Sequence, residues 1–166
     1  PRDKRVVYDE NTNDIWWGDI NIPIRPDLFT HYRDFAKKYL DTVNRYEVDV
    51  YAGWDLENRI KIRVVCTSPY HALFVRNMFI PTDEVFEKPD FVIYNVCKLK
   101  LSNVTEKLEE GVEKDVELRD KLVALNFTTM EMVIYGTEYA GEMKKGVLTL
   151  LMYLMQNKGH LTLHSG

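Results

Sequence analysis

The feature that most constrains the fold is the stretch MEMVIYGTEYAGEMKKGVLTLLMYLM, residues 130–155 of a chain of 166. An apolar run, MVIY, ends at Gly136, and a second and longer apolar run, VLTLLMYLM, begins at Val147. Short apolar runs of about 4–8 residues that end at glycine are typical of buried strands, and longer runs are typical of helices. We therefore predict a strand, a glycine-containing loop and a buried helix, a unit common in α/β domains.

The remaining pattern extends this unit into one α/β domain over residues 1–166. Two amphipathic runs begin at helix-start signals, Asp27 for the first and Ser68 followed by Pro69 for the second. Strands are expected at residues 4–9, 45–53, 59–66, 91–97, 122–129, 130–137 and 160–164, and helices at 28–43, 68–80 and from Gly146 onward. Strands and helices do not alternate strictly, so we expect a mixed β-sheet flanked by helices. The strongly charged residues 98–121 are expected to form a solvated helix or a mobile insertion.

Composition and charge exclude several classes of protein. Apolar residues make up 45% of the chain and charged residues 29%, which fits a soluble protein with a core. The net charge is −4 with both signs interspersed, so we expect no nucleic-acid partner, which would require a clustered basic face. No signal peptide and no membrane-spanning stretch are recognisable, so no membrane association is expected. Cys66 and Cys97 lie in or beside apolar runs, and we expect buried free thiols in a reducing compartment.

The adjacent lysines Lys144 and Lys145 are the strongest candidates for chemistry. They precede the apolar run, near the N-terminal end of the predicted helix, where the helix dipole disfavours cations by a few tenths of a kcal/mol or more. Mutual repulsion, the helix end and some burial would favour a neutral amine, which can act as a base or a metal ligand. A charged amine would instead hold a carboxylate or phosphate. The alternative is that both amines extend into solvent and bind nothing.

Four further side chains are candidates for the same site. Tyr139 either packs with a solvated hydroxyl or lines the same site, and Glu142 either pairs with a lysine or complements the helix dipole. His164 ends the last predicted strand. If that strand neighbours the one before the lysines, His164 and Lys145 could share one divalent metal. His160 would face the same side of the strand and is the competing ligand.

Other aromatic and histidine side chains are expected to be structural. Trp16, Trp17 and Trp54 lie beside glycine and aspartate, and we expect them to close a core beneath loops. His31 and His71 fall within predicted helices, and we expect them to be packing or surface residues.

Several of these stretches resemble the ATP-dependent phosphoenolpyruvate carboxykinase family. The resemblance rests above all on YGTEYAGEMKKG, residues 135–146, followed by an apolar helix and by LTLHSG at residues 161–166. The segments PRDKRVV, WWGDINIPI, YAGWD, RIKIRVV, YHALFVRNMFI, DEVFEKPDFVIYN and LNFTTMEMVI agree in the same order. The resemblance therefore covers nearly the whole chain apart from residues 98–121.

This resemblance implies a reaction and a set of roles. Enzymes of this family convert oxaloacetate and ATP to phosphoenolpyruvate, carbon dioxide and ADP in gluconeogenesis, with Mn²⁺ at the substrate and Mg²⁺ on the nucleotide. By the match, Lys145 and His164 are the Mn²⁺ ligands. Lys144 and Lys145 are the catalytic residues, and Lys144 lies beside the phosphate or enolate. Tyr139, Gly141 and Lys145 bind oxaloacetate, phosphoenolpyruvate or carbon dioxide. Repulsion between the two lysines would then help to keep Lys145 unprotonated for the metal.

The resemblance also implies parts that these residues do not supply. The family's substrate-binding arginine lies upstream of PRDK, and Arg2 is not its equivalent. No GxxxxGK[ST] phosphate loop occurs in the sequence, and Ser165 and Gly166 fit the family's pattern after the histidine only partly. We therefore expect residues 1–166 to be the amino-terminal, substrate-side domain of a longer enzyme, inactive alone, with ATP bound by a downstream domain.

Two non-enzymatic alternatives remain open from the sequence. One is a truncated product that serves as a metal-binding or assembly module, and the other is an anion-binding module that uses the lysines only as charges. The oligomeric state is left open. The expected location is the cytosol, with a microbody as the alternative.

Overall fold

A computed structural model describes residues 4–104 and 120–162 of the chain. The strands of this part are β1 (Lys4–Val7), β2 (Ile22–Ile24), β3 (Tyr46–Ala52), β4 (Ile60–Cys66), β5 (Ile80–Pro81), β6 (Phe91–Asn95), β7 (Leu122–Asn126) and β8 (Glu131–Tyr135). The α-helices are α1 (Pro26–Thr42), α2 (Pro69–Met78) and α3 (Gly141–Asn157), and short 3₁₀ turns occur at Glu10–Thr12 and Leu101–Asn103. The predicted α/β domain with a mixed sheet and flanking helices is therefore confirmed.

The described strands form one sheet in the order β2-β1-β7-β8-β6-β4-β3-β5. Strands β4, β6 and β8 run parallel to one another, whereas β7 is antiparallel to β8 and β3 is antiparallel to β4. The strands predicted at residues 122–129 and 130–137 are thus confirmed, and they form the β7–β8 hairpin. The edge strands β2 and β5 were missed because they are short and contain Pro23 and Pro81, and proline is tolerated in a sheet mainly at its edges.

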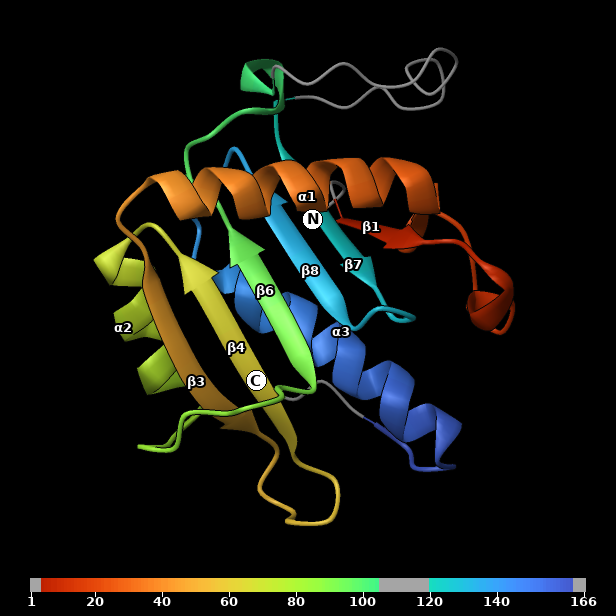
Figure 1. Cartoon of the computed structure of the whole chain (residues 1–166). Helices are drawn as coiled ribbons and strands as arrows, with labels where there is room; N and C mark the ends of the chain where they lie inside the picture. Colours follow the sequence, from red (N-terminus) through yellow and green to blue (C-terminus); the bar gives the residue numbers. More distant parts are fainter. Residues whose placement is uncertain (1–3, 105–119, 163–166) are drawn as a thin grey trace.

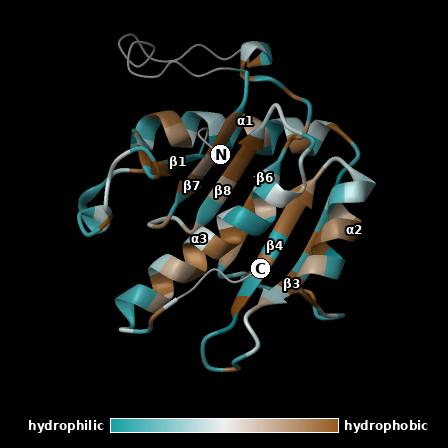
Figure 2. Cartoon of the chain, turned by 180° about the vertical axis from the view of Figure 1, so that it is seen from behind, coloured by the Kyte–Doolittle hydropathy of each residue, from teal (hydrophilic) through white to brown (hydrophobic). Residues whose placement is uncertain are grey.

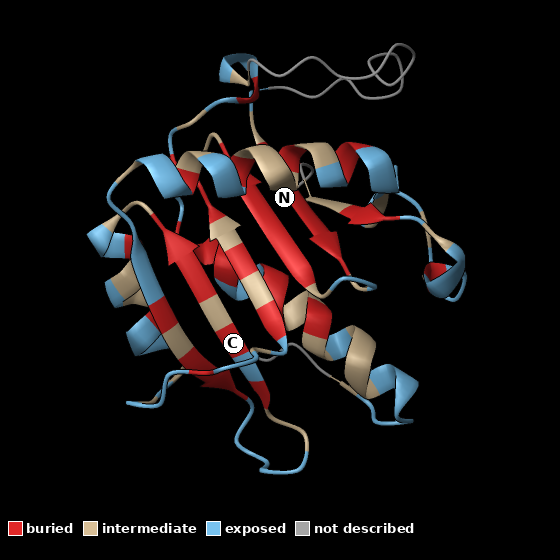
Figure 3. Cartoon of the chain, viewed as in Figure 1, coloured by how far each residue is buried: buried red, intermediate tan, exposed pale blue. Residues whose placement is uncertain are grey.

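Helices cover both faces of the sheet and create two cores. In Figure 1, α1 crosses in front of the strands, while α2 and α3 lie behind them. Figure 2 shows that rear face, with α2 and α3 lying across the sheet and hydrophobic residues frequent along the strands. Strands β7 and β8 are buried along their whole length, as Figure 3 shows, because they lie centrally between the two helical layers. Their sequences, LVALN and EMVIY, are accordingly apolar with little alternation.

Two polar contacts fix α1 on its face of the sheet. The Tyr135 hydroxyl donates to the backbone oxygen of Tyr32 at 2.6 Å, and Arg33 Nη1 lies 2.6 Å from Glu131 Oε1. The helix begins at Pro26, slightly earlier than predicted, and Asp27 lies in its first turn rather than at the N-cap. The N-cap is Arg25, whose guanidinium pairs with the Asp27 carboxylate at 2.7 Å.

The structure confirms some packing predictions and overturns others. Cys66 and Cys97 are buried free thiols as expected, and burial raises the pKa of Cys66 to about 11. Trp16 and Trp54 do not close a core, since they are 85% and 86% exposed. Trp16 lies in the connection before β2 and Trp54 in the connection between β3 and β4, so the prediction for these two residues was wrong.

Two further predictions concern the ends of segments. Residues 160–162 do not form the beginning of the strand predicted at 160–164, and 163–166 lie outside the described residues. Of the charged segment 98–121, residues 105–119 also lie outside them. Among the residues that are described, no helix is both long enough and apolar enough to cross a membrane.

Candidate functional site

The predicted site lies at the edge of the sheet where three neighbouring parallel strands end. The segment after β4 leads into α2, the segment after β6 holds Cys97, and the loop 136–140 after β8 leads into α3. Because β4, β6 and β8 are adjacent and parallel, these three segments converge at one edge. The carboxyl ends of strands are where open α/β sheets commonly bind ligands.

The loop 136–140 is anchored to the neighbouring segments through its backbone. Gly136 N–H donates to the Leu99 carbonyl at 2.8 Å, and Thr137 N–H donates to the Cys97 carbonyl at 2.9 Å. On the other side, the Glu138 carbonyl lies 2.8 Å from Nε2 of His71 in α2. The loop that carries Tyr139 and leads into α3 is therefore anchored by both neighbours.

The lysine pair lies inside α3, not before it. The helix begins at Gly141, so Lys144 and Lys145 are its fourth and fifth residues. The dipole acts mainly on the first turn and adjacent helical residues do not face each other, so both electrostatic penalties are smaller than predicted. Both side chains are also exposed, and the expectation of partial burial was wrong. Within the described part of the chain, neither amine is in an ion pair with a carboxylate, so both can meet a ligand.

Tyr139, Gly141 and Lys145 meet at the start of α3. The Lys145 amine lies over the Tyr139 ring, 4.9 Å from its centroid. A Cβ at Gly141 would lie 2.4 Å from Cζ of this ring and 2.5 Å from its hydroxyl oxygen. Only a residue without a side chain therefore allows Tyr139 to rest against the helix beside Lys145. The structure thus brings together all three residues predicted to bind substrate.

Replacing Gly141 with alanine should displace the Tyr139 ring without unfolding the protein. Alanine favours a helix over glycine by up to about 1 kcal/mol, so the fold should persist, while the new methyl group occupies the position of the ring. Ring currents from Tyr139 should shift the Lys145 Cε protons upfield in the wild type, and Gly141→Ala should return them to the values of a free lysine. Gly18→Ala is the control, because nothing lies within 4 Å of its Cβ position. An unchanged Lys145 shift in Gly141→Ala would contradict this arrangement.

Glu142 pairs with neither candidate lysine. Its carboxylate is buried and lies 3.0 Å from Nζ of Lys121, which immediately precedes β7. It also stands in the first turn of α3, where an acidic side chain complements the dipole. Glu142 therefore fastens α3 to the sheet and leaves Lys144 and Lys145 unneutralised.

A further lysine approaches α3 from β1. Lys4 Nζ lies 3.4 Å from the Thr149 hydroxyl, which donates to the Lys145 carbonyl at 2.9 Å. Burial lowers the pKa of Lys4. This contact links the PRDK segment of the sequence to the helix that carries the lysine pair.

Of the two predicted metal ligands, Lys145 and His164, the described residues include only Lys145. Lys145 offers one nitrogen, but His164 lies outside the described residues. His160 is described and is not near Lys145. Its backbone N–H bonds to the Met155 carbonyl near the far end of α3, about 15 Å along the axis from Lys145 at 1.5 Å per residue.

No complete metal centre is present among these residues. Within residues 4–104 and 120–162, no group of three His, Cys, Asp or Glu side chains is placed to hold a metal ion. An exposed, unpaired amine is nevertheless compatible with metal coordination once it is deprotonated. Lys145 therefore fits as one ligand of a site that requires further donors.

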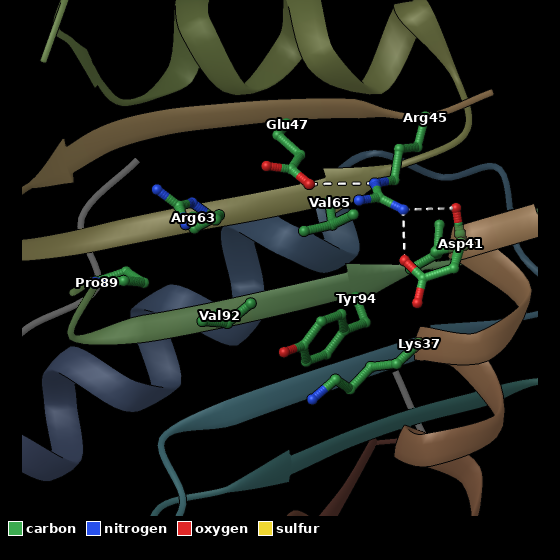
Figure 4. A pocket seen from close by; sticks show the side chains of 10 residues that line it. Lys37, Asp41, Arg45, Glu47, Arg63, Val65, Pro89, Val92 and Tyr94 are labelled. Atoms are coloured by element: carbon green, nitrogen blue, oxygen red, sulfur yellow. Dashed lines mark hydrogen bonds and ion pairs between the residues drawn. The ribbon is translucent and has the colours of Figure 1, made fainter. Parts of the chain in front are cut away.

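A hollow of about 220 Å³ on the α1 face is a weaker candidate site (Figure 4). Arg45 lines this hollow, and Figure 4 shows its guanidinium between the carboxylates of Asp41 and Glu47. A second cation at the rim, Arg63, is paired with Asp49 at 2.8 Å. The third cation of the lining, Lys37, has its amine over the Tyr94 ring, 5.7 Å from the centroid. Because two of the three cations already have carboxylate partners, the hollow offers less to an anion than the lysine pair does.

His71 and Asn95 are the residues at this edge that sequence reasoning missed. Both side chains are fully buried and contact each other, whereas His71 was expected only to pack or to lie at the surface. The available signal was the position of His71 in the first turn of a helix that directly follows a strand, at the edge where the lysine loop also begins.

Comparison with known proteins shows the family of the chain. A model of the family described as phosphoenolpyruvate carboxykinase matches residues 1–166. The chain belongs to this family. The match to the phosphoenolpyruvate carboxykinases extends through the segment that contains Tyr139, Gly141, Lys144, Lys145 and His164.

Curated relatives carry the same name in full. The proteins called phosphoenolpyruvate carboxykinase (ATP) in Emericella nidulans and Neurospora crassa are each 47% identical to the chain over 171 residues. Phosphoenolpyruvate carboxykinase (ATP) 2 of Salinibacter ruber is 45% identical over 170 residues. The alignments cover 99% of this chain but only 27% of each fungal protein and 30% of the bacterial one. The chain therefore spans less than a third of the length of these relatives.

Proposed function

We propose that this chain is the amino-terminal, substrate-side part of an ATP-dependent phosphoenolpyruvate carboxykinase. The observation that carries the proposal is the cluster of Tyr139, Gly141 and Lys145 at a strand end, in a chain that matches this family throughout. Oxaloacetate, phosphoenolpyruvate and carbon dioxide are the proposed ligands of this part. ATP with Mg²⁺ would be bound by residues beyond the chain, which has no phosphate loop of the GxxxxGK[ST] type.

The proposed reaction places negative charge where the lysines can act. The bond between the methylene carbon and its carboxylate breaks in oxaloacetate, which releases carbon dioxide and leaves an enolate. The enolate oxygen then attacks the γ-phosphorus of ATP, and the bond to ADP breaks, which gives phosphoenolpyruvate. Lys144 and Lys145 have no carboxylate partner among the described residues, so their charge or lone pair is available to the enolate and phosphoryl oxygens.

The remaining residues have binding roles in this proposal. The Tyr139 hydroxyl and the Gly141 backbone N–H, which stands at the first helical position without an i−4 partner, can donate to a substrate carboxylate. Lys145 and His164 are the proposed ligands of Mn²⁺, which when bound would stabilise charge on the enolate oxygen. Glu142 contributes indirectly, because its contact with Lys121 holds the first turn of α3 in place.

Metal binding by this chain separates the proposal from its alternatives. We expect the chain to bind Mn²⁺ weakly, as measured by electron paramagnetic resonance. This binding should be lost in Lys145→Ala and in His164→Ala. His160→Ala is the matched control and should bind as the wild type does. Unchanged binding in both ligand variants would refute the metal assignment. Binding of oxaloacetate without metal, which weakens as the lysines deprotonate at high pH, would favour the anion-binding module instead.

A further inference from the structure

His71 carries a buried imidazole that has no role in the proposed reaction. The side chain is fully buried in the first turn of α2, yet both of its ring nitrogens have partners. Nε2 lies 2.8 Å from the Glu138 carbonyl oxygen, and Nδ1 lies 3.3 Å from the amide nitrogen of Asn95. These contacts join α2, the end of β6 and the loop after β8 at the edge that holds the candidate site.

The hydrogen bonds around Asn95 determine which nitrogen of His71 carries the proton. The backbone N–H of Cys97 donates to Asn95 Oδ1 at 2.9 Å, so the other amide atom, the donor Nδ2, faces His71. Because Nδ2 donates, Nδ1 of His71 must accept. The proton is therefore on Nε2, which donates to the Glu138 carbonyl. The chain of donors runs from Cys97 through Asn95 and His71 to the lysine loop.

The final acceptor belongs to the peptide unit directly before Tyr139. That peptide is held at both of its polar atoms, because its N–H, on Tyr139, donates to the Thr137 hydroxyl at 3.1 Å. The contact of the oxygen with His71 and that of the N–H with Thr137 together oppose rotation of the peptide plane. The direction in which the Tyr139 side chain leaves the backbone is thereby set, against Gly141 and beneath the Lys145 amine.

We propose that His71 is a positioning residue for substrate binding: its Nε2–H orients the 138–139 peptide and so places Tyr139 beside Lys145. An apolar residue would fill the same buried space but would leave the Glu138 carbonyl without this donor. The inference rests on the proposed function, because it assigns Tyr139 to oxaloacetate or phosphoenolpyruvate. It goes beyond that function because it makes the position of Tyr139 depend on a hydrogen bond from His71 in α2.

Two substitutions in the complete protein that carries this chain test the role. His71→Leu removes the donor, whereas His71→Gln retains an amide N–H at about the distance of Nε2 from the backbone. In His71→Leu we expect the KM for oxaloacetate to rise about tenfold, as for the loss of one hydrogen bond, with a smaller change in kcat. His71→Gln should restore most of the loss. His31→Leu, in α1 on the other face of the sheet, is the control and should leave the KM unchanged.

The outcomes separate this inference from the proposed function. A wild-type protein that does not turn over oxaloacetate and ATP would refute the proposed function. An active wild type in which His71→Leu and His71→Gln raise the KM equally, or not at all, would refute the role of His71.

Two spectroscopic measurements test the role of His71 without an activity assay. The ¹⁵N spectrum of His71 should show the proton on Nε2, and a proton on Nδ1 would overturn the inference. The upfield shift of the Lys145 Cε protons should be lost in His71→Leu, and a retained shift would also overturn it.

Discussion

Replacing Lys145 with methionine should lower the kcat/KM of the complete protein for oxaloacetate by at least about 10³-fold, the range seen when a group that stabilises transition-state charge is removed. The side chain is exposed and its described contact is the Tyr139 ring, so the fold loses little. An exposed substitution of this kind changes stability by only about 0.5 kcal/mol. A coupled assay of phosphoenolpyruvate formation measures the loss, and a melting curve shows that the variant remains folded.

Lys145→Arg distinguishes a metal ligand from a simple cation. Arginine keeps the positive charge but cannot give up its proton in a protein, so it cannot offer a neutral nitrogen to Mn²⁺. If Lys145 is a metal ligand, the arginine variant should be about as inactive as the methionine variant. Retention of more than about a tenth of wild-type activity would instead assign Lys145 the role of holding an anion. Lys158→Arg, near the other end of α3, is the matched control and should be fully active.

The fold could be predicted from sequence where apolar periodicity determined it. Strands β3, β4, β6, β7 and β8 were found close to their observed bounds, because each is an apolar or alternating run between turn residues. The start of α3 could not be found in this way. GEMKKG is bounded by two glycines, which disfavour a helix, and its two lysines are disfavoured near a helix start by the dipole. The buried Glu142 and Met143 nevertheless hold this stretch in the helix through contacts with distant segments.

The candidate site was predicted as a list of residues, but its geometry depends on contacts between distant segments. Tyr139 and Lys145 were recognised from one short motif, and the structure brings them together as expected. The support from His71 could not be read from the sequence, because it joins residues 67 positions apart through a fold that places β4 and β8 on either side of β6. The exposure of Trp16 and Trp54 was equally unpredictable, since it depends on where their loops lie relative to the sheet.

Gly136 should tolerate substitution least among the loop residues, because two independent effects act at this position. Its φ is +68°, a conformation that costs a residue with a side chain about 1–2 kcal/mol. A Cβ here would also lie 2.2 Å from the Asp120 carbonyl oxygen, which is backbone and cannot move without shifting the start of β7. We expect Gly136→Ala to lower the free energy of unfolding by about 3 kcal/mol or more. In urea this would shift the midpoint by about 1–3 M.

Gly159→Ala separates the steric effect from the conformational one. Gly159 has a similar φ of +78°, but nothing lies within 4 Å of its Cβ position, so it should lose only the conformational part. Equal losses in the two variants would show that the contact with Asp120 contributes nothing. A larger loss at Gly136 would show that the site loop depends on close packing against β7.

Because Gly136 N–H also donates to the Leu99 carbonyl, any shift of this turn would be transmitted to the loop that carries Tyr139. The oxaloacetate KM of a Gly136→Ala protein that remains folded should therefore rise, whereas that of Gly159→Ala should not.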